Sequence, residues 1–116
     1  TISMKNLDGL KPFDRAKDCL EDYAIDFLSL FQTVKSPTGI EGVRKIFSDG
    51  FAMKTMEEYL KENPTMLTTE EQKDAVFIEK STKLNALADE INTNIESLTK
   101  EKLEEIIESA RKIFHY

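Results

Sequence analysis

Hydrophobic residues recur at intervals of three and four along nearly the whole chain, and this spacing restricts the fold more than any other feature. One face of an α-helix has that period, whereas a half-buried β-strand alternates every second residue. No stretch alternates with period two over more than four residues. We therefore predict an all-α chain without strands. Its 116 residues are the size of a single domain, with residues 1–11 as a loosely ordered lead-in.

Prolines and a glycine divide the first half of the chain into two predicted helices. The first extends from Pro12 to about Lys35, since proline suits the first helical position and Pro37 cannot continue the helix. The second ends before Pro64. We predict that it is broken or kinked at residues 48–50, because an interior glycine costs about 1 kcal/mol against alanine.

Capping signals mark the starts of three predicted helices. Thr38 with Glu41, and Thr68 with Glu71, have the spacing of a capping box. In this motif the threonine hydroxyl accepts from a backbone N–H of the first turn, and the glutamate accepts from the threonine N–H. Thr99 is the predicted cap of the last helix.

The third predicted helix is the longest, over residues 69–97, and the last one extends from about residue 100 to the C-terminus. Four amphipathic helices with short loops predict an antiparallel four-helix bundle. The excess length of the third helix could pair with a second copy of the chain. Polar Ser81, Thr82 and Asn85 on or near its apolar seam indicate that such a homodimer would be weak.

Acidic and basic residues are interspersed along the sequence, with a net charge of -6. Nucleic-acid binding depends on clustered cations that release counterions, so we predict no nucleic-acid partner. The longest purely apolar runs have four residues. A membrane-spanning helix needs about 20, so we expect no membrane span. Charge would attract a basic protein partner.

Cys19 is the only cysteine, so it can form neither an internal disulfide nor a cysteine-based zinc site. A single thiol fits a reducing compartment. The chain begins with Thr1 rather than methionine, which leaves a processed secreted protein open as an alternative.

Acidic residues follow one side of the first predicted helix at intervals of four. This acid ladder contains Asp14, Asp18, Glu21, Asp22 and Asp26, and it surrounds the apolar Ile25. A carboxylate di-metal site needs inward-facing acids with Glu-x-x-His pairs, whereas these acids lie opposite the apolar face. Calcium needs a longer loop of regularly spaced oxygen ligands. We therefore predict no metal and no cofactor.

The acid ladder has two interpretations: an ordinary solvated face, or a docking face centred on Ile25. Like charges four residues apart on a helix repel by a few tenths of a kcal/mol, and Arg15 and Lys17 relieve this only partly. The solvated face is the simpler interpretation, and the unfavourable cluster around an apolar residue keeps the docking face open. We predict an adaptor, inhibitor or immunity-type protein that binds a basic partner through this ladder.

Catalytic signatures are missing from the sequence. There is no Gly-x-Ser-x-Gly motif and no glycine-rich phosphate loop. His115, the only histidine, lies next to the end of the sequence, where it would be poorly positioned as a base. Cys19 lies at the edge of the apolar face, as a packed thiol would. We predict a protein that is not an enzyme.

The alternative function is carriage of a lipid or other apolar ligand inside the bundle. Its predicted groove consists of Phe51, Met53, Met56 and Tyr59. Methionine adapts its shape and is common at promiscuous apolar surfaces. The simpler interpretation is that these side chains complete the core.

Overall fold

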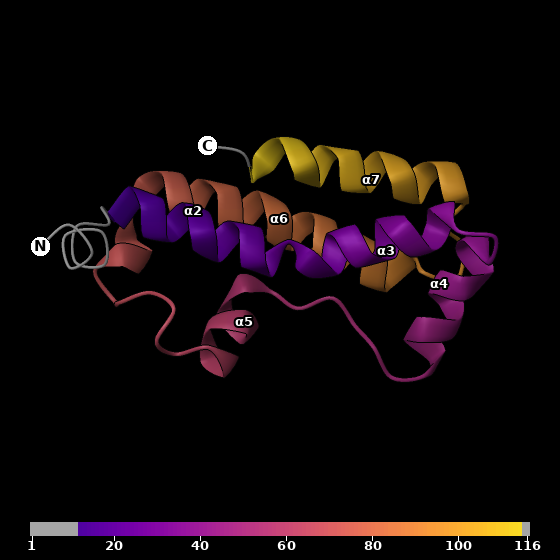
Figure 1. The fold of residues 1–116 in the computed structure, drawn as a ribbon, viewed down its shortest axis with the longest axis horizontal. Coiled ribbons are helices and arrows are strands. Elements are labelled where there is room, and N and C mark those ends of the chain that lie inside the picture. Colours follow the sequence, from indigo (N-terminus) through magenta and orange to yellow (C-terminus); the bar gives the residue numbers. More distant parts are fainter. Residues whose placement is uncertain (1–11, 115–116) are drawn as a thin grey trace, which may run out of the picture.

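The computed structural model describes residues 12–114, and all the regular elements in that range are helices (Figure 1). This confirms the all-α prediction. The predicted lead-in, residues 1–11, and His115 lie outside the described residues. The elements are α2 (Pro12–Tyr23), α3 (Ile25–Lys35), α4 (Gly39–Ser48), α5 (Met56–Glu62), the 3-10 turn η1 (Glu71–Lys73), α6 (Ala75–Asn94) and α7 (Lys100–Ile113).

The first predicted helix ends at Lys35 as expected, but Ala24 divides it into α2 and α3. Two backbone hydrogen bonds still cross the junction, from the Ala24 N–H to the Leu20 carbonyl at 2.9 Å and from the Leu28 N–H to the Ala24 carbonyl at 3.1 Å. The two helices therefore follow one nearly continuous path (Figure 1). The apolar period does not show this interruption, because Ala24 is itself buried in the core.

The second predicted helix is broken where expected. Helix α4 ends at Ser48, and Gly50 follows with φ 109°, a left-handed conformation that favours glycine. The helix resumes only at Met56, in α5. The interruption is thus longer than a kink, and α4 and α5 are separate short helices.

The capping predictions have mixed outcomes. Thr38 makes no capping hydrogen bond, and Glu41 pairs with Arg44 instead, so the first predicted box is wrong. The capping box of α5 is formed by Thr55 with Glu58, a pair that the sequence analysis did not identify.

The second predicted box does form, since the Thr68 N–H donates to Glu71 at 2.7 Å and the Glu71 N–H donates to Thr68 at 3.1 Å. It opens η1 rather than the long helix, which begins after Asp74 caps the Phe77 N–H at 2.9 Å. Thr99 caps α7 as predicted, accepting from the Lys102 N–H at 3.1 Å.

The long helices lie alongside one another (Figure 1). Helices α2, α3 and α6 run in one direction and α7 runs back against them, while α4, residues 49–55 and α5 form the return path between α3 and α6. The core between them is apolar. Its largest fully buried side chains include Phe27, Leu84, Ile91, Leu103 and Ile107.

Asparagine side chains of α6 hold the non-helical part of the return path. Asn92 accepts from the Met53 N–H at 2.8 Å and donates to the Met53 carbonyl at 2.9 Å. Asn85 accepts from the Met56 N–H at 2.8 Å. These bonds satisfy backbone groups that a continuous helix would have paired internally. Asn85, which we expected near a weak dimer seam, therefore contributes to packing within the chain.

Candidate functional site

The described acids of the ladder lie on the outer side of α2 and α3. Asp18, Glu21 and Asp22 are exposed, and Asp26 is half-buried. The backbone of Asp14 belongs to α2, but its side chain lies outside the described part of the structure. Ile25, at the start of α3, is 51% exposed. The structure thus places an exposed isoleucine among the carboxylates.

Helix α5 brings further acids to this surface. Lys54 forms an ion pair with Glu62 at 2.8 Å. The hydrogen bond to Glu62 is the main cause that raises the Lys54 pKa, and the negative charges of Glu62, Asp26 and Glu58 raise it further. The acids of α5 and α3 therefore surround the same lysine. Sequence analysis missed Glu58 and Glu62, because the packing of α5 against α2 depends on the tertiary fold.

We use the name Ile25 patch for this surface. It comprises Ile25, Lys54 and the acids Asp18, Glu21, Asp22, Asp26, Glu58 and Glu62. Six carboxylates and one ammonium group give a net charge of −5, taken from the residue types. A small hollow of about 180 Å³ lies within the patch, lined by Ile25, Asp22, Asp26 and Lys54 together with Tyr23, Tyr59 and Asn63.

Two tyrosines fix the base of the Ile25 patch. The Tyr59 hydroxyl donates to the Asp22 carboxylate, and the Tyr23 hydroxyl donates to the Lys54 carbonyl. Their rings meet edge to face, with centroids 5.7 Å apart. Burial raises the pKa of both phenols, and the negative charge of Asp22 adds to the effect at Tyr59. Both tyrosines therefore remain protonated donors at neutral pH.

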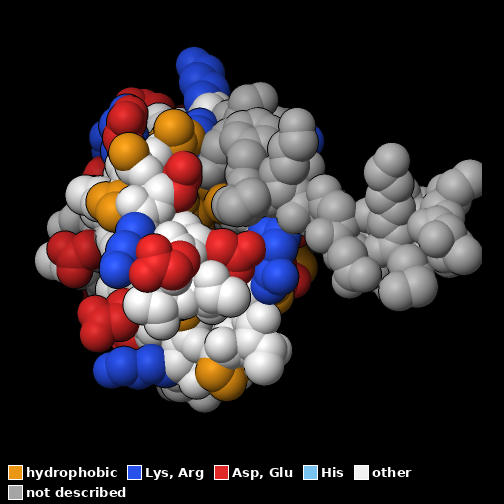
Figure 2. Space-filling view, turned by 90° about the vertical axis from the view of Figure 1, so that its left-hand side faces the viewer, with side chains coloured by type: hydrophobic (Ala, Val, Ile, Leu, Met, Phe, Trp, Pro, Cys, Tyr) orange, Lys and Arg blue, Asp and Glu red, His pale blue; other side chains and the backbone are white. Residues whose placement is uncertain are grey.

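Arg15, which we expected to neutralise part of the acid ladder, forms its ion pair with Glu71, outside the ladder. Its guanidinium pairs with Glu71 at 3.0 Å and donates to the Met66 carbonyl at 3.1 Å. At this end of the molecule, where α2 and α6 begin, acidic and basic side chains alternate over the surface (Figure 2). No ion pair between Arg15 and an acid of the ladder is thus present among the described residues.

The predicted ligand groove does not form an open surface. Met53, Met56 and Tyr59 belong to the buried core. Phe51 is partly buried and contacts Phe47 edge to face, with ring centroids 5.3 Å apart. Tyr59 instead supports the Ile25 patch through Asp22. A ligand at these four positions would have to displace core side chains.

Cys19 is fully buried. Burial, followed by the negative charge of Asp22, raises the pKa of its thiol to about 12. Only the thiolate is nucleophilic, so this thiol is unreactive at neutral pH. Within residues 12–114, no three acidic, histidine or cysteine side chains are grouped closely enough to hold a metal ion.

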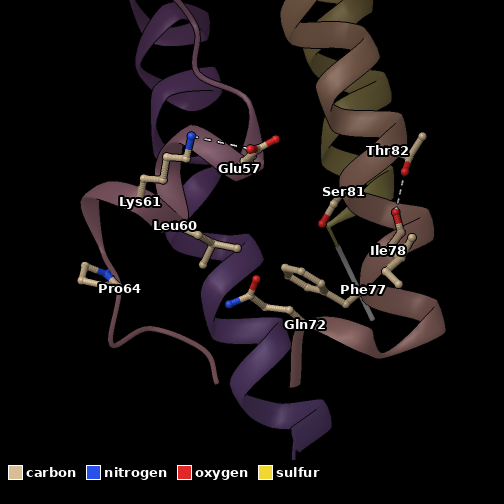
Figure 3. Close-up of a pocket in the computed structure, with 9 residues that line it drawn as sticks. All are labelled: Glu57, Leu60, Lys61, Pro64, Gln72, Phe77, Ile78, Ser81 and Thr82. Carbon is tan, nitrogen blue, oxygen red and sulfur yellow. Dashed lines mark hydrogen bonds and ion pairs between the residues drawn. The ribbon is translucent and has the colours of Figure 1, made fainter. Parts of the chain in front are cut away.

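Helices α5 and α6 line a larger, open cavity, which sequence analysis did not predict. Its volume is about 620 Å³. Leu60 and Pro64 line one side, and Phe77, Ile78 and Ser81 line the other (Figure 3). The residues come from segments about 15 positions apart, so no local motif could have shown that they meet. None of the described helices is long and apolar enough to cross a membrane.

Searches against known protein families, characterised proteins and solved structures found no match to this chain. The geometry of the Ile25 patch and of the cavity is therefore the only basis for a functional proposal.

Proposed function

We propose that this protein is a non-enzymatic interaction module that binds a basic protein partner through the Ile25 patch. The observation that supports this proposal most strongly is the 51% exposure of Ile25 among carboxylates from two separate parts of the chain. Adaptors, inhibitors and immunity-type proteins act in this way. As the scaffold for this surface we propose an antiparallel bundle in which α4 and α5 replace one long helix.

The patch combines an apolar contact with a charge. Complete burial of an isoleucine side chain contributes about 1.5–3 kcal/mol of favourable free energy. Because Ile25 is about half exposed, about half of this free energy can still be gained when a partner covers the side chain. The net charge of the patch draws a basic surface toward it. Surface charges contribute more to the rate and orientation of association than to affinity, so Ile25 is the expected centre of the contact.

The carboxylates of the patch are partly held in place before any partner binds. Asp22 accepts from Tyr59, and Glu58 accepts from the Thr55 N–H at 2.9 Å. Immobilising a flexible side chain on binding costs about 0.5–1.5 kcal/mol. Fixed acids avoid part of that cost.

The alternative, a carrier with its ligand at Phe51, Met53, Met56 and Tyr59, has less support, because three of these four side chains fill the core. A bound lipid there would have to replace their packing contacts.

A charge-reversal experiment tests the proposal. The triple variant Asp18→Lys, Ile25→Ser, Asp26→Lys changes the patch but keeps Asp22, which Tyr59 supports. Immobilised protein is incubated at low salt with an extract of its source cells, and the retained proteins are quantified by mass spectrometry. We expect a basic protein that the wild type retains and that the variant retains about tenfold less.

The matched control is Asp89→Lys with Glu96→Lys, which introduces the same charge change at exposed residues of α6 and the α6–α7 turn. It should retain the same basic protein as the wild type. If the patch variant and the control lose the same proteins equally, retention reflects total charge and the proposal is wrong. Circular dichroism verifies that both variants are folded.

A further inference from the structure

The cavity between α5 and α6 has the dimensions of a small-molecule site. Its volume of about 620 Å³ falls in the usual range of about 300–1,000 Å³. Leu60 of α5 and Phe77 of α6 point toward one another across it (Figure 3). Ile78, in its wall, is 49% exposed. These side chains give the cavity an apolar surface that solvent can reach.

Ser81 supplies a polar atom with an unmet hydrogen bond. Its side chain is only 7% exposed, and its hydroxyl oxygen has no hydrogen-bond partner among the described residues. A serine inside a helix often bonds the carbonyl four residues earlier. Thr82 does this, donating to the Ile78 carbonyl at 2.8 Å. The Ser81 oxygen instead points into the space between α6 and α5 (Figure 3).

The other polar side chains that line the cavity each have a partner. Glu57 pairs with Lys61 at 3.6 Å. The Gln72 amide donates to the Leu67 carbonyl at 3.2 Å, and Thr82 is bonded within its own helix. The buried Ser81 hydroxyl is thus the polar group for which a ligand would provide a partner.

We propose that this cavity binds a small, uncharged aromatic molecule with one hydroxyl group, which hydrogen-bonds to Ser81. The ligand is uncharged because the buried polar group that faces it is a neutral hydroxyl, and the charged lining residues Glu57 and Lys61 pair with each other. An aromatic ring suits the Phe77 side chain, since aromatic pairs gain from edge-to-face contact. The Ser81 oxygen is closed off from solvent, so the neighbouring side chains must part slightly to admit the ligand's hydroxyl.

Two probe molecules distinguish this proposal from non-specific apolar binding. p-Cresol carries a ring and a hydroxyl, and toluene carries the ring alone. Each is titrated into the full chain, and backbone amide NMR shifts are followed. We expect saturable shifts for p-cresol at Leu60 and residues 77–82. The absence of saturable shifts there would overturn the proposal.

Ser81→Ala tests the hydrogen bond itself, with Thr82→Ala as the matched control. A neutral hydrogen bond corresponds to about a five- to tenfold change in affinity. We expect Ser81→Ala to weaken p-cresol binding by that factor and to change toluene binding less than twofold. Thr82→Ala should change neither. Equal weakening of both probes by Ser81→Ala, or the same effect from Thr82→Ala, contradicts the proposed role of Ser81.

The Ser81→Ala variant is expected to fold, because alanine favours helices and the change removes an unsatisfied buried hydroxyl group. The cavity shares none of the residues altered in the charge-reversal test of the Ile25 patch. Failure of either proposal therefore leaves the other intact.

Discussion

Cys19 illustrates how position determines the chemistry of a residue in this protein. The sequence placed it at the edge of the apolar face, and the structure shows it fully buried, with its sulfur 4.0 Å from that of Met56. Ile25 is the opposite case, an apolar residue that the fold leaves exposed. In both, the helical period predicted which side of the helix the residue would occupy. The helical period could not predict which residues of α5 lie beside Cys19 and Ile25.

We predict that the Cys19 thiol lowers stability at alkaline pH. Its pKa is about 12 in the folded chain, above the ordinary value of 9.0. The unfolded state therefore loses this proton first as the pH rises, and the free energy of unfolding falls above about pH 9. Thermal melting between pH 7 and 11 measures the effect.

Cys19→Ala is the comparison for this prediction, since it removes the titrating thiol and leaves Tyr23 and Tyr59 in place. Its melting temperature should fall less between pH 8 and 10 than that of the wild type. Identical pH profiles for the two proteins would show that Cys19 is not responsible.

At the scale of the elements, local sequence signals identified helix ends better than helix continuity. Thr99 caps its helix as predicted, and the break at residues 48–50 is present. Thr38 fails as a cap because its backbone is already helical, with φ −72° and ψ −25°, whereas a capping residue normally adopts an extended conformation. Thr55, with ψ 162°, has that conformation.

We predict that Asn92 stabilises the non-helical segment of the return path, residues 49–55. Asn92→Ala removes both hydrogen bonds to Met53 and leaves these partly buried backbone groups without their partner. The expected loss is about 1–3 kcal/mol in the free energy of unfolding, measured by urea denaturation.

Asn94→Ala is the matched control for Asn92→Ala, because the Asn94 side chain is exposed and bonds only the Glu90 carbonyl of its own helix. It should change stability by less than about 0.5 kcal/mol. If the two alanine variants were equally stable, the proposed role of Asn92 in holding residues 51–55 would be wrong.

For the whole molecule, the distribution of charge is more informative than its total. The net charge of -6 already indicated a basic partner. The fold adds Glu58 and Glu62 to the acids of α2 and α3, and it directs Arg15 toward Glu71. The Ile25 patch thereby combines acids from α2, α3 and α5.

This distribution predicts salt-dependent association with the partner identified by the charge-reversal experiment. Raising the ionic strength from 0.05 to 0.5 M shortens the Debye length from roughly 14 to 4 Å, which screens the attraction between separated charges. We expect the association rate to fall on the order of tenfold, with a smaller change in the dissociation rate. Surface plasmon resonance measures both rates. A dissociation rate that changed more than the association rate would contradict electrostatic steering by the patch.

The sequence alone determined the all-helical fold, the outward position of the acid ladder and several helix ends. These properties depend on residues within one or two turns of one another, so periodicity and capping chemistry are sufficient to predict them. Only the tertiary structure decided the extent of the Ile25 patch, the burial of the predicted ligand groove and the cavity at Ser81. Each of these depends on where α5 packs against α2 and α6, and that packing is set by contacts between residues distant in sequence.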